Sequence, residues 1–440
     1  MRLHIGIDDT DSAKGGCTTY IAAQLVEKLS QMQVRFIDYP NIIRLNPNVP
    51  YKTRGNAAVA LRLEAPDTEY DKVREIAIQT VEQYGRIGEE GTDPAIVFLR
   101  GKPPPVVVRL SRRALTEILS LHDAISTLRN SSGSAVSYGS GLGLVGSLAA
   151  VGNTLAGDHT YELIAYRRPR NLGKPRRVDE DSVIRMDRLT SPNTFNNYDP
   201  TNKRVLIKPH GPDPVLIGLR GETPRVVYRA FRLLRLREAV ERWVIFRTNH
   251  GTDAHFKAVP PRMPQANSPV VLKGVVHTMP IRIYGGHVFC ELQTSRGVVQ
   301  CAAFEPTGKF KDVVASLIPG DHVTVFGGAK QHGQLPLTVN LEKLVIEHLS
   351  EDVVPQNPRC PRCDKRMKSA GRGQGFRCPR CCYSSSKISK RLVKRERNLL
   401  PGLYVPDKKA HRHLTKPLSR YGLEKRRWDG KIPTGAWHTP

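Results

Sequence analysis

The sequence predicts a multidomain α+β protein. Its 440 residues exceed one compact domain of about 100–200 residues, so we expect roughly two to four domains. Helix and strand patterns alternate over the first 260 residues, five strand-like runs follow between 268 and 349, and two Cys-x-x-Cys motifs come after them. This order predicts two α/β regions, a small β-barrel and a metal-binding ribbon.

The first region, residues 1–130, has the pattern of an α/β domain. Leu3, Ile5 and Ile7 alternate with other residues as in a strand, and apolar residues from Tyr20 to Leu29 recur at helical spacing. Further strands are expected at 34–38, 56–63 and 95–99, helices at 68–84 and 114–128, and a stiff connector at the three prolines 103–105.

The second region, residues 131–262, has the pattern of a smaller α/β sandwich. Strands are expected at 160–167 and 204–209 and a helix at 225–240. Its glycine-rich start, 139–152, lacks the preceding strand of a dinucleotide-binding fingerprint. We therefore interpret these glycines as sites of close helix packing rather than as a phosphate loop.

The third region, residues 268–350, has the plan of an OB-fold. Five strand-like runs carry one helix, 308–318, between the third and the fourth, and the runs are 270–276, 288–294, 298–304, 322–328 and 337–346. OB-folds stack single-stranded bases on aromatic rings. The candidate rings, about half of which we expect in the core, are Tyr284, Phe289, Phe304 and Phe310. Cys290 and Cys301 are expected to be buried as small apolar residues.

The fourth region, residues 358–384, predicts a structural zinc site. Cys360 and Cys363 are separated by 14 residues from Cys378 and Cys381, and each pair fits one tight turn. Four thiolates complete a tetrahedron and leave no position for a reactive water. Cys382 is an alternative to Cys381, although the paired spacing favours Cys381.

Charge is distributed unevenly along the chain. The protein carries 68 Lys and Arg against 41 Asp and Glu, a net charge of +27, which indicates a polyanionic partner such as nucleic acid. The last 82 residues contain 23 Lys and Arg and 5 Asp and Glu. Residues 385–440 lack apolar periodicity, so we expect a basic tail that is flexible or ordered only on a partner.

Two further observations concern location. No run of about 18 apolar residues predicts a membrane-spanning helix, and the first residues do not resemble a signal peptide. Clustered cysteines in a long chain favour metal binding in a reducing compartment. We expect a cytoplasmic protein without a membrane partner.

The most unusual polar segment is the acidic loop, Asp8, Asp9 and Asp11, which lies between a strand and a helix. Three carboxylates this close repel one another unless a cation compensates, and hard oxygen ligands suit magnesium. Thr18 and Thr19 follow at the helix start, where backbone N–H groups favour phosphate. The alternative is that Asp11 or Ser12 caps the helix and the other carboxylates are solvated.

Two nearby segments could approach phosphate. The first consists of Lys14, Gly15 and Gly16, and the second of Lys52, Arg54 and Gly55. A cation next to glycine lets the backbone and the charge reach an anion together. We assign both segments to ATP binding, with a charged turn entering a strand as the alternative for the second.

The segments IGIDDTDS and GCTTY, then KTRGNAAVA, GSGLGLVG, TYELIAYR, TFNNYD, GPDPVLIGLRG and RTNHGTDAH, resemble archaeal tRNA(Ile) 2-agmatinylcytidine synthetases. The resemblance extends over about residues 1–382. It implies a kinase-like domain (1–130), a ferredoxin-like domain (131–262), the OB-fold (268–350) and the zinc ribbon (358–384). It does not cover the tail (385–440).

The resemblance also implies an activity. Such enzymes use ATP, which ends as AMP, to join agmatine to carbon 2 of the wobble cytidine of an isoleucine tRNA, which then decodes AUA. The 2-oxo group is activated by phosphoryl transfer, because phosphorylation turns a poor leaving group into a good one. Asp8, Asp9 and Asp11 match the family's acidic metal-binding loop, and Thr18 matches its autophosphorylated threonine.

The expected partners are ATP, magnesium, zinc, agmatine and the anticodon loop and acceptor regions of the tRNA. Agmatine is a dication, so its pocket is expected to offer carboxylates; the candidates in matched segments are Asp199, Asp213, Glu222 and Asp253. The main alternative is a non-catalytic OB-fold and zinc-ribbon protein that binds RNA or single strands. A third reading is a nucleotide-dependent enzyme acting on another RNA base or a small cofactor.

Overall fold

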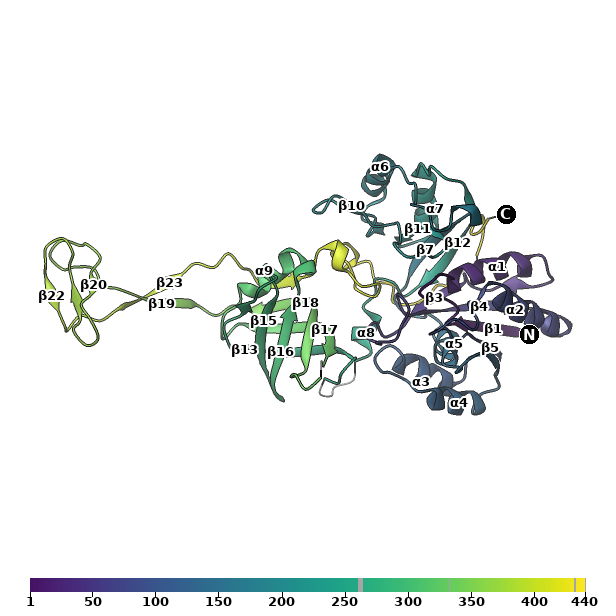
Figure 1. Ribbon diagram of the computed structural model, residues 1–440, viewed down its shortest axis with the longest axis horizontal. Coiled ribbons are helices and arrows are strands. Elements are labelled where there is room, and N and C mark those ends of the chain that lie inside the picture. Colours follow the sequence, from purple (N-terminus) through teal and green to yellow (C-terminus); the bar gives the residue numbers. More distant parts are fainter. Residues whose placement is uncertain (260–263, 332, 431–432, 440) are drawn as a thin grey trace.

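The computed structural model describes residues 1–259, 264–331, 333–430 and 433–439. It shows an α/β body, a β-barrel beside it and a small ribbon held away from both on a two-stranded stalk (Figure 1). The predicted multidomain α+β class is confirmed. The predicted end of the second domain, residue 262, lies outside the described residues.

One sheet of ten strands runs through the whole body. Its order is β6-β5-β1-β4-β3-β12-β7-β11-β8, with β2 paired to β4. The strands are β1 (Arg2–Asp8), β2 (Arg35–Phe36), β3 (Asn41–Arg44), β4 (Ala57–Glu64), β5 (Ala95–Arg100), β6 (Ser134–Ser137), β7 (Thr160–Arg167), β8 (Thr194–Phe195), β11 (Val215–Gly221) and β12 (Val240–Thr248).

The two predicted α/β regions are therefore halves of one sheet. They meet where β3 pairs in parallel with β12, with Asn41 opposite Arg247. Arg247 is fully buried, and its Nε donates to Asp38 Oδ1 at 2.9 Å. The sequence did not indicate β12, because the predicted helix 225–240 continues into its first residue.

Helices cover both faces of the first half of the sheet. Alternate residues of β4 face opposite layers: Val59 and Leu61 pack with α1 and α2, whereas Ala58 and Ala60 pack with α3, α4 and α5. The helices of the body are α1 (Thr18–Ser30), α2 (Tyr70–Tyr84), α3 (Pro105–Arg113), α4 (Leu121–Arg129), α5 (Gly143–Gly152), α6 (Glu180–Thr190) and α7 (Pro224–Leu233). Within the described ranges, no helix combines the length and apolarity needed to cross a membrane.

Three local predictions for the body are corrected. The single helix expected at 114–128 is two helices, because Pro105 starts α3 early and Ser120 and Asp123 form a capping box that starts α4. The strand expected at 204–209 is reduced to the hairpin of β9 (Tyr198–Asp199) and β10 (Arg204–Val205). The helix expected at 225–240 ends at Leu233.

The barrel has the predicted OB-fold order. Its elements are β13 (Pro269–Val276), β14 (Ile281–Arg282), β15 (Val288–Thr294), β16 (Gly297–Ala303), α9 (Lys309–Ala315), β17 (His322–Lys330) and β18 (Thr338–His348). Cys290 and Cys301 face each other across β15 and β16 and are buried, as predicted. Of the candidate aromatic rings, Phe310 is in the core and Tyr284 is fully exposed.

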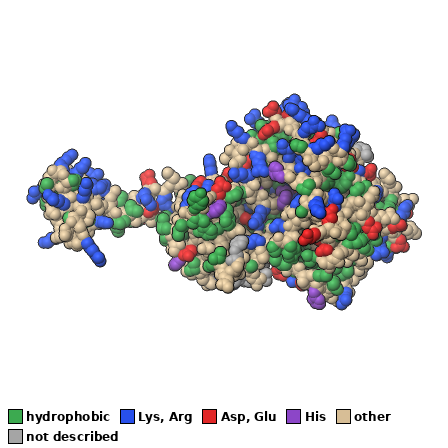
Figure 2. Space-filling model, in the orientation of Figure 1, with side chains coloured by type: hydrophobic (Ala, Val, Ile, Leu, Met, Phe, Trp, Pro, Cys, Tyr) green, Lys and Arg blue, Asp and Glu red, His purple; other side chains and the backbone are tan. Residues whose placement is uncertain are grey.

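The stalk and ribbon extend from the barrel. β19 (Asp352–Gln356) pairs with β23 (Arg391–Arg395) to form the stalk. Beyond it, β20 (Lys368–Ser369), β21 (Phe376–Arg377) and β22 (Ser384–Ser385) form a three-stranded sheet around the cysteine cluster. Figure 2 shows Lys and Arg side chains over this end of the molecule.

The prediction of a flexible tail is wrong. After the stalk, β24 (Gly402–Tyr404) adds to β18 of the barrel, and the chain then returns to the body past α8 (Ala254–Lys257). Leu414 and Arg420 are buried, and Trp437 joins the main core beside Phe36. A few isolated apolar residues and ion pairs to distant acids order this segment, and neither leaves a periodic pattern in the sequence.

Candidate active site and zinc centre

A cavity of about 620 Å³ lies where the two halves of the sheet, the loop before β4 and the tail meet. The acidic loop lines one side, through Asp8, Asp9 and Asp11. The tail lines another, through the segment that includes Arg412 and His413. Segments more than 400 residues apart therefore share one chamber.

Asp8 and Asp9 stand at the end of β1 with little compensating charge. Burial raises the pKa of Asp8 well above its usual range, and the neighbouring carboxylates of Asp9 and Asp11 raise it further. Burial also raises the pKa of Asp9 to about 6, although Asp9 Oδ2 accepts a hydrogen bond from the Asp93 N–H at 3.0 Å. Carboxylates held in this way are suited to a cation.

Helix α5 explains the glycine-rich segment 139–152. A Cβ placed on Gly146 would lie 1.7 Å from Asp8 Oδ2, and one on Gly6 would lie 2.2 Å from the Ser147 carbonyl oxygen. Glycine at these positions lets α5 pack directly on β1 and on the Asp8 side chain. The prediction of close helix packing is confirmed.

Asp11 differs from its two neighbours because it has a cationic partner. Arg54 Nη2 lies 2.6 Å from Asp11 Oδ2, and Arg54 Nη1 lies 3.1 Å from Asp213 Oδ2. The same guanidinium donates to the Gly16 carbonyl at 2.8 Å. Arg54 therefore ties together the acidic loop, the glycine pair and the second half of the sheet.

The start of α1 faces the same cavity. Thr18 is its first residue, is buried, and accepts a hydrogen bond from the Thr10 hydroxyl at 3.0 Å. Thr18 and Thr19 both line the cavity. Among the described residues, no side chain caps this helix end. Its free N–H groups are therefore available to an anion in the cavity.

The two segments assigned to ATP binding are placed differently. Lys52, Arg54 and Gly55 line the cavity, whereas Lys14, Gly15 and Gly16 lie behind its wall. Gly16 has a φ of 82°, and a Cβ there would lie 2.9 Å from the Arg86 side chain. Its lack of a side chain thus serves the fold of the acidic loop.

Of the four carboxylates considered for agmatine, only Asp213 lines the cavity. Asp199 accepts backbone hydrogen bonds within the β9–β10 hairpin. Glu222 pairs with Arg420 and Lys425, and Asp253 pairs with Lys343. These last two are occupied by cations of the tail and the barrel.

A second polar group in the cavity escaped the sequence analysis as a set of side chains. Glu162 of β7 binds Arg220 Nε at 2.8 Å and lies 3.5 Å from both Arg44 and His250. Burial alone would raise the pKa of Glu162, but Arg220, His250 and Arg44 hold it well below its usual range. Glu162, Arg220 and His250 lie in three segments that carry the family resemblance, but only the fold brings them together.

The zinc centre has the predicted geometry. The Sγ atoms of Cys360, Cys363, Cys378 and Cys381 all lie within 4.8 Å of one another. Two of the separations are 3.5 Å (Cys360 to Cys381) and 3.4 Å (Cys363 to Cys378), close to the about 3.8 Å edge of a tetrahedron with Zn–S bonds of about 2.3 Å. Cys382 is exposed, so Cys381 completes the set.

The donor set therefore fits structural zinc. Among the residues that the structure describes, these sulfur atoms form the one group of three or more potential metal-ligating side chains whose ligand atoms converge. The carboxylates of the acidic loop do not converge in that way.

Family comparisons match almost the whole chain. Residues 4–140 match the TiaS TCKD domain, 141–255 the TiaS FLD domain, 270–347 an OB-fold nucleic acid binding domain and 357–399 the TiaS C-terminal zinc ribbon domain. The tRNA(Ile) 2-agmatinylcytidine synthetase TiaS of Archaeoglobus fulgidus is 41% identical over 97% of this chain and 99% of its own length. That of Pyrococcus horikoshii is 40% identical over 95% and 97%.

Solved structures give the same result. A complex of TiaS with its isoleucine tRNA and ATP is 39% identical, has a TM-score of 0.87 and covers 98% of this chain and 99% of that one. A complex of TiaS with the same tRNA, AMPCPP and agmatine is 38% identical, with a TM-score of 0.85 and coverage of 97% and 99%. The chain thus belongs to the tRNA(Ile) 2-agmatinylcytidine synthetase family.

Proposed function

We propose that this chain joins agmatine to carbon 2 of the wobble cytidine of an isoleucine tRNA, with ATP as the source of energy. The observation that carries the proposal is the match over nearly the full length to relatives with this name and to complexes containing tRNA, nucleotide and agmatine. The cavity supports it, because carboxylates, an open helix start and cations lie around one chamber. We place this reaction in the cytoplasm, where its tRNA is found.

ATP is placed with its phosphates between the start of α1 and the acidic loop. The N–H groups of Thr18 and Thr19 offer donors there, and Lys52 and Arg54 add positive charge. Magnesium would be held by Asp8 and Asp9, whose raised pKa values reflect burial with little compensating charge, and would neutralise phosphate charge during transfer. Asp11 holds Arg54 in position through its ion pair.

Thr18 is the residue proposed to take a phosphoryl group. Its hydroxyl is held by Thr10 and lines the same cavity as Asp8. Lys14, Gly15 and Gly16 act indirectly in this scheme, since they shape the acidic loop from behind the cavity wall.

Agmatine is placed near Asp213. This carboxylate lines the cavity and is shared between Arg54 and Arg176. An incoming guanidinium would compete with these arginines for the same oxygens. Glu162 is a poorer candidate, because two buried arginines already surround it.

The tRNA is held by the barrel and the ribbon. An OB-fold offers a surface for single strands, and the ribbon carries cations for phosphate contacts. The target base leaves the anticodon stack to reach the cavity.

The direct test mixes the purified protein with ATP, agmatine and a transcript of the isoleucine tRNA. The expected product is an ATP-dependent mass gain of agmatine minus water on the wobble cytidine. Asp8→Ala and Asp9→Ala are each expected to lower the ligation rate by at least about a hundredfold. Asp71→Ala, an exposed carboxylate on α2, is the matched control and should leave the rate unchanged.

The competing function is a non-catalytic RNA-binding protein. In that case the transcript would bind and gain no mass, and Asp8→Ala would have no turnover to lose. Binding without ATP-dependent product at any substrate concentration would therefore favour this alternative.

A further inference from the structure

Three cations from distant parts of the chain meet where the body, the barrel and the tail join. Lys330 Nζ, at the end of β17, donates to the Asn48 carbonyl oxygen at 2.7 Å. Arg412 Nη1, from the tail, donates to Asn48 Oδ1 at 2.6 Å. Lys52 Nζ donates to the Val49 carbonyl oxygen at 3.0 Å. Two adjacent residues thus gather all three positive groups.

The oxygens that hold these cations are neutral. Lys330 Nζ also donates to Asn267 Oδ1 at 2.7 Å, so both of its partners are amide oxygens. Glu342 contacts the group through Arg412 at 3.1 Å. Burial, together with Arg412, lowers the pKa of Lys52, and burial followed by Lys52 and Arg412 lowers that of Lys330. The cations repel one another, which an anion between them would relieve.

The support beneath the cluster is rigid. Asn48 is fully buried, and a Cβ on Gly328 of β17 would lie 2.1 Å from Asn48 Oδ1. Asn46 Nδ2 donates to the Asn267 carbonyl oxygen at 2.9 Å. Asn48 Nδ2 is buried and has no hydrogen-bond partner among the described residues, so a further donor lies at the same point. The body and barrel are packed tightly here, and the cations are held in place.

The cluster borders the reaction cavity. Lys52 and Arg412 line it, together with Lys408 and Lys409 of the tail. Figure 2 shows a hollow between the barrel and the body in which blue and purple side chains are visible. A strand of RNA that runs from the barrel into the cavity has to cross this junction.

We propose that Lys52, Lys330 and Arg412 form a phosphate-binding site that takes a backbone phosphate of the tRNA beside the nucleotide entering the cavity. This proposal rests on the proposed function for its ligand. Phosphate of ATP has the same chemistry, but Lys330 belongs to the barrel and Arg412 to the tail. The acidic loop and the start of α1, where ATP phosphates are placed, line a different part of the cavity wall.

The test removes one charge while keeping a polar side chain. Lys330→Gln is compared with Lys330→Arg, which retains the charge, and with Lys273→Gln, an exposed lysine of the same barrel that pairs with Glu347. The dissociation constant for the isoleucine tRNA transcript is measured at several salt concentrations, and the KM for ATP in ligation is measured beside it.

Lys330→Gln is expected to weaken tRNA binding about threefold to tenfold and to lower the slope of log K against log salt by about 0.7 to 0.9. Its KM for ATP should not change, Lys330→Arg should restore the slope, and Lys273→Gln should match the wild type. An unchanged slope for Lys330→Gln overturns the proposal, since a merely structural role would weaken binding equally at every salt concentration. A raised KM for ATP with normal tRNA binding also overturns it and assigns the site to the nucleotide.

The binding measurement is independent of turnover. If the wild type bound the transcript with the expected salt slope and formed no product, the proposed function would fail and the phosphate site would stand. Product formation with an unchanged slope in Lys330→Gln would give the reverse result.

Discussion

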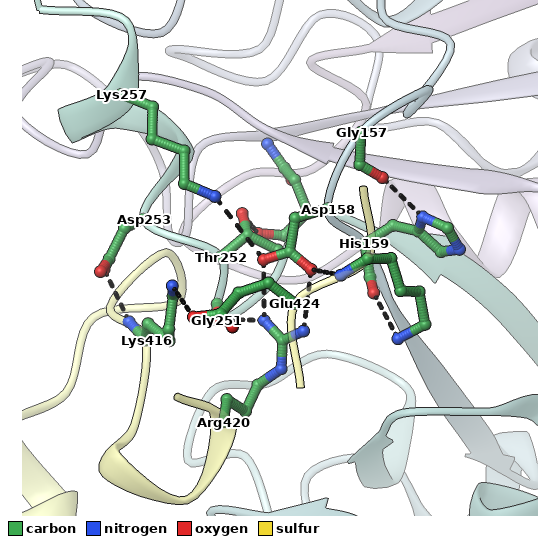
Figure 3. Close-up of polar contacts among 12 residues, drawn as sticks. Gly157, Asp158, His159, Gly251, Thr252, Asp253, Lys257, Lys416, Arg420 and Glu424 are labelled. Atoms are coloured by element: carbon green, nitrogen blue, oxygen red, sulfur yellow. Dashed lines mark hydrogen bonds and ion pairs between the residues drawn. The ribbon is translucent and has the colours of Figure 1, made fainter. Parts of the chain in front are cut away.

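The zinc ribbon and the C-terminal tail are both strongly basic, but they use their charge differently. In the ribbon, Arg359 is 61% exposed and its partner Asp364 is 75% exposed. In the tail, Arg420 is fully buried between Asp158 and Glu222, and it donates to the Gly251 carbonyl oxygen. Figure 3 shows Asp158 between Arg420 and Lys257. Similar composition therefore covers an open surface in one region and an internal clamp in the other.

The difference is one of energy as well as place. An exposed ion pair contributes about 0–1 kcal/mol, because water screens it. Removing one partner of a buried pair costs about 3–5 kcal/mol, because the other charge is left without compensation. A large part of the tail's charge is therefore committed to holding the tail on the body, and less of it is free for RNA than the net charge of +27 indicates.

The largest expected effect tests the clamp. Arg420→Ala should lower the free energy of unfolding of the body by about 3–5 kcal/mol, because Asp158 and Glu222 lose their buried partner. Arg359→Ala in the ribbon is the matched control and should change it by less than about 0.5 kcal/mol. Urea unfolding followed by tryptophan fluorescence reports on the body and tail, since Trp243, Trp428 and Trp437 all lie there. Equal effects of the two substitutions would remove the distinction between the regions.

The second prediction tests whether the ribbon folds separately. Cys360→Ser should release zinc, weaken tRNA binding by about tenfold or more, and leave the tryptophan unfolding transition unchanged. Cys382→Ser, an exposed thiol outside the site, should retain zinc and bind normally. Zinc content by mass spectrometry and tRNA affinity are the measurements. A fall in body stability on zinc loss would contradict the separation.

The third prediction concerns pH. Burial lowers the pKa of His250 to about 4 and is the first cause of the lowered pKa, about 4, of His159, which lies under the tail. A histidine with a lower pKa in the folded state binds its proton less well there, so its stabilising effect is complete above about pH 6.5 and is lost as pH falls toward 4. The unfolding free energy of the body should fall over this window. His250→Gln should flatten the dependence, and His122→Gln, at an exposed position, should not. An unchanged pH dependence in His250→Gln would show that other groups cause it.

The smallest expected effect probes a single ribbon cation. Arg380→Gln should raise the dissociation constant for tRNA about twofold to threefold and slightly reduce its salt slope. Zinc content and body stability should not change, because Arg380 is exposed and is not a ligand. Titrations of transcript at two salt concentrations measure the effect. A change in body stability would mean that this ribbon cation also serves the clamp.

The sequence predicted the parts that depend on local pattern. The four cysteines, the OB-fold strands and the helix from Thr18 all follow from spacing or periodicity, and the structure has them in place. The glycine-rich segment was correctly interpreted, because glycine at Gly146 and at Gly6 serves one close helix contact. The family resemblance is confirmed over the whole body.

The parts that depend on long-range contacts could not be predicted. Glu222 and Asp253 are common types of loop residue, and only the fold shows that Arg420 and Lys343 occupy them. The parallel pairing of β3 with β12 leaves no local signal. The kinase-like character of the first domain, the assigned domain boundaries and the roles of Thr18 and the ATP-binding residues remain predictions for the experiments above.

The position of Trp437 in the main core has a consequence for synthesis. Its ring lies 5.2 Å from that of Phe36, and roughly 400 residues of chain separate the two. At about 5–20 residues per second, a ribosome needs roughly 20–80 s to make that span. The nascent N-terminal half therefore waits, with part of its core uncovered, until the barrel, the ribbon and the tail have been translated. A chain cut short before the tail would lack the tryptophan that closes the core, so completion of this fold also reports completion of the message.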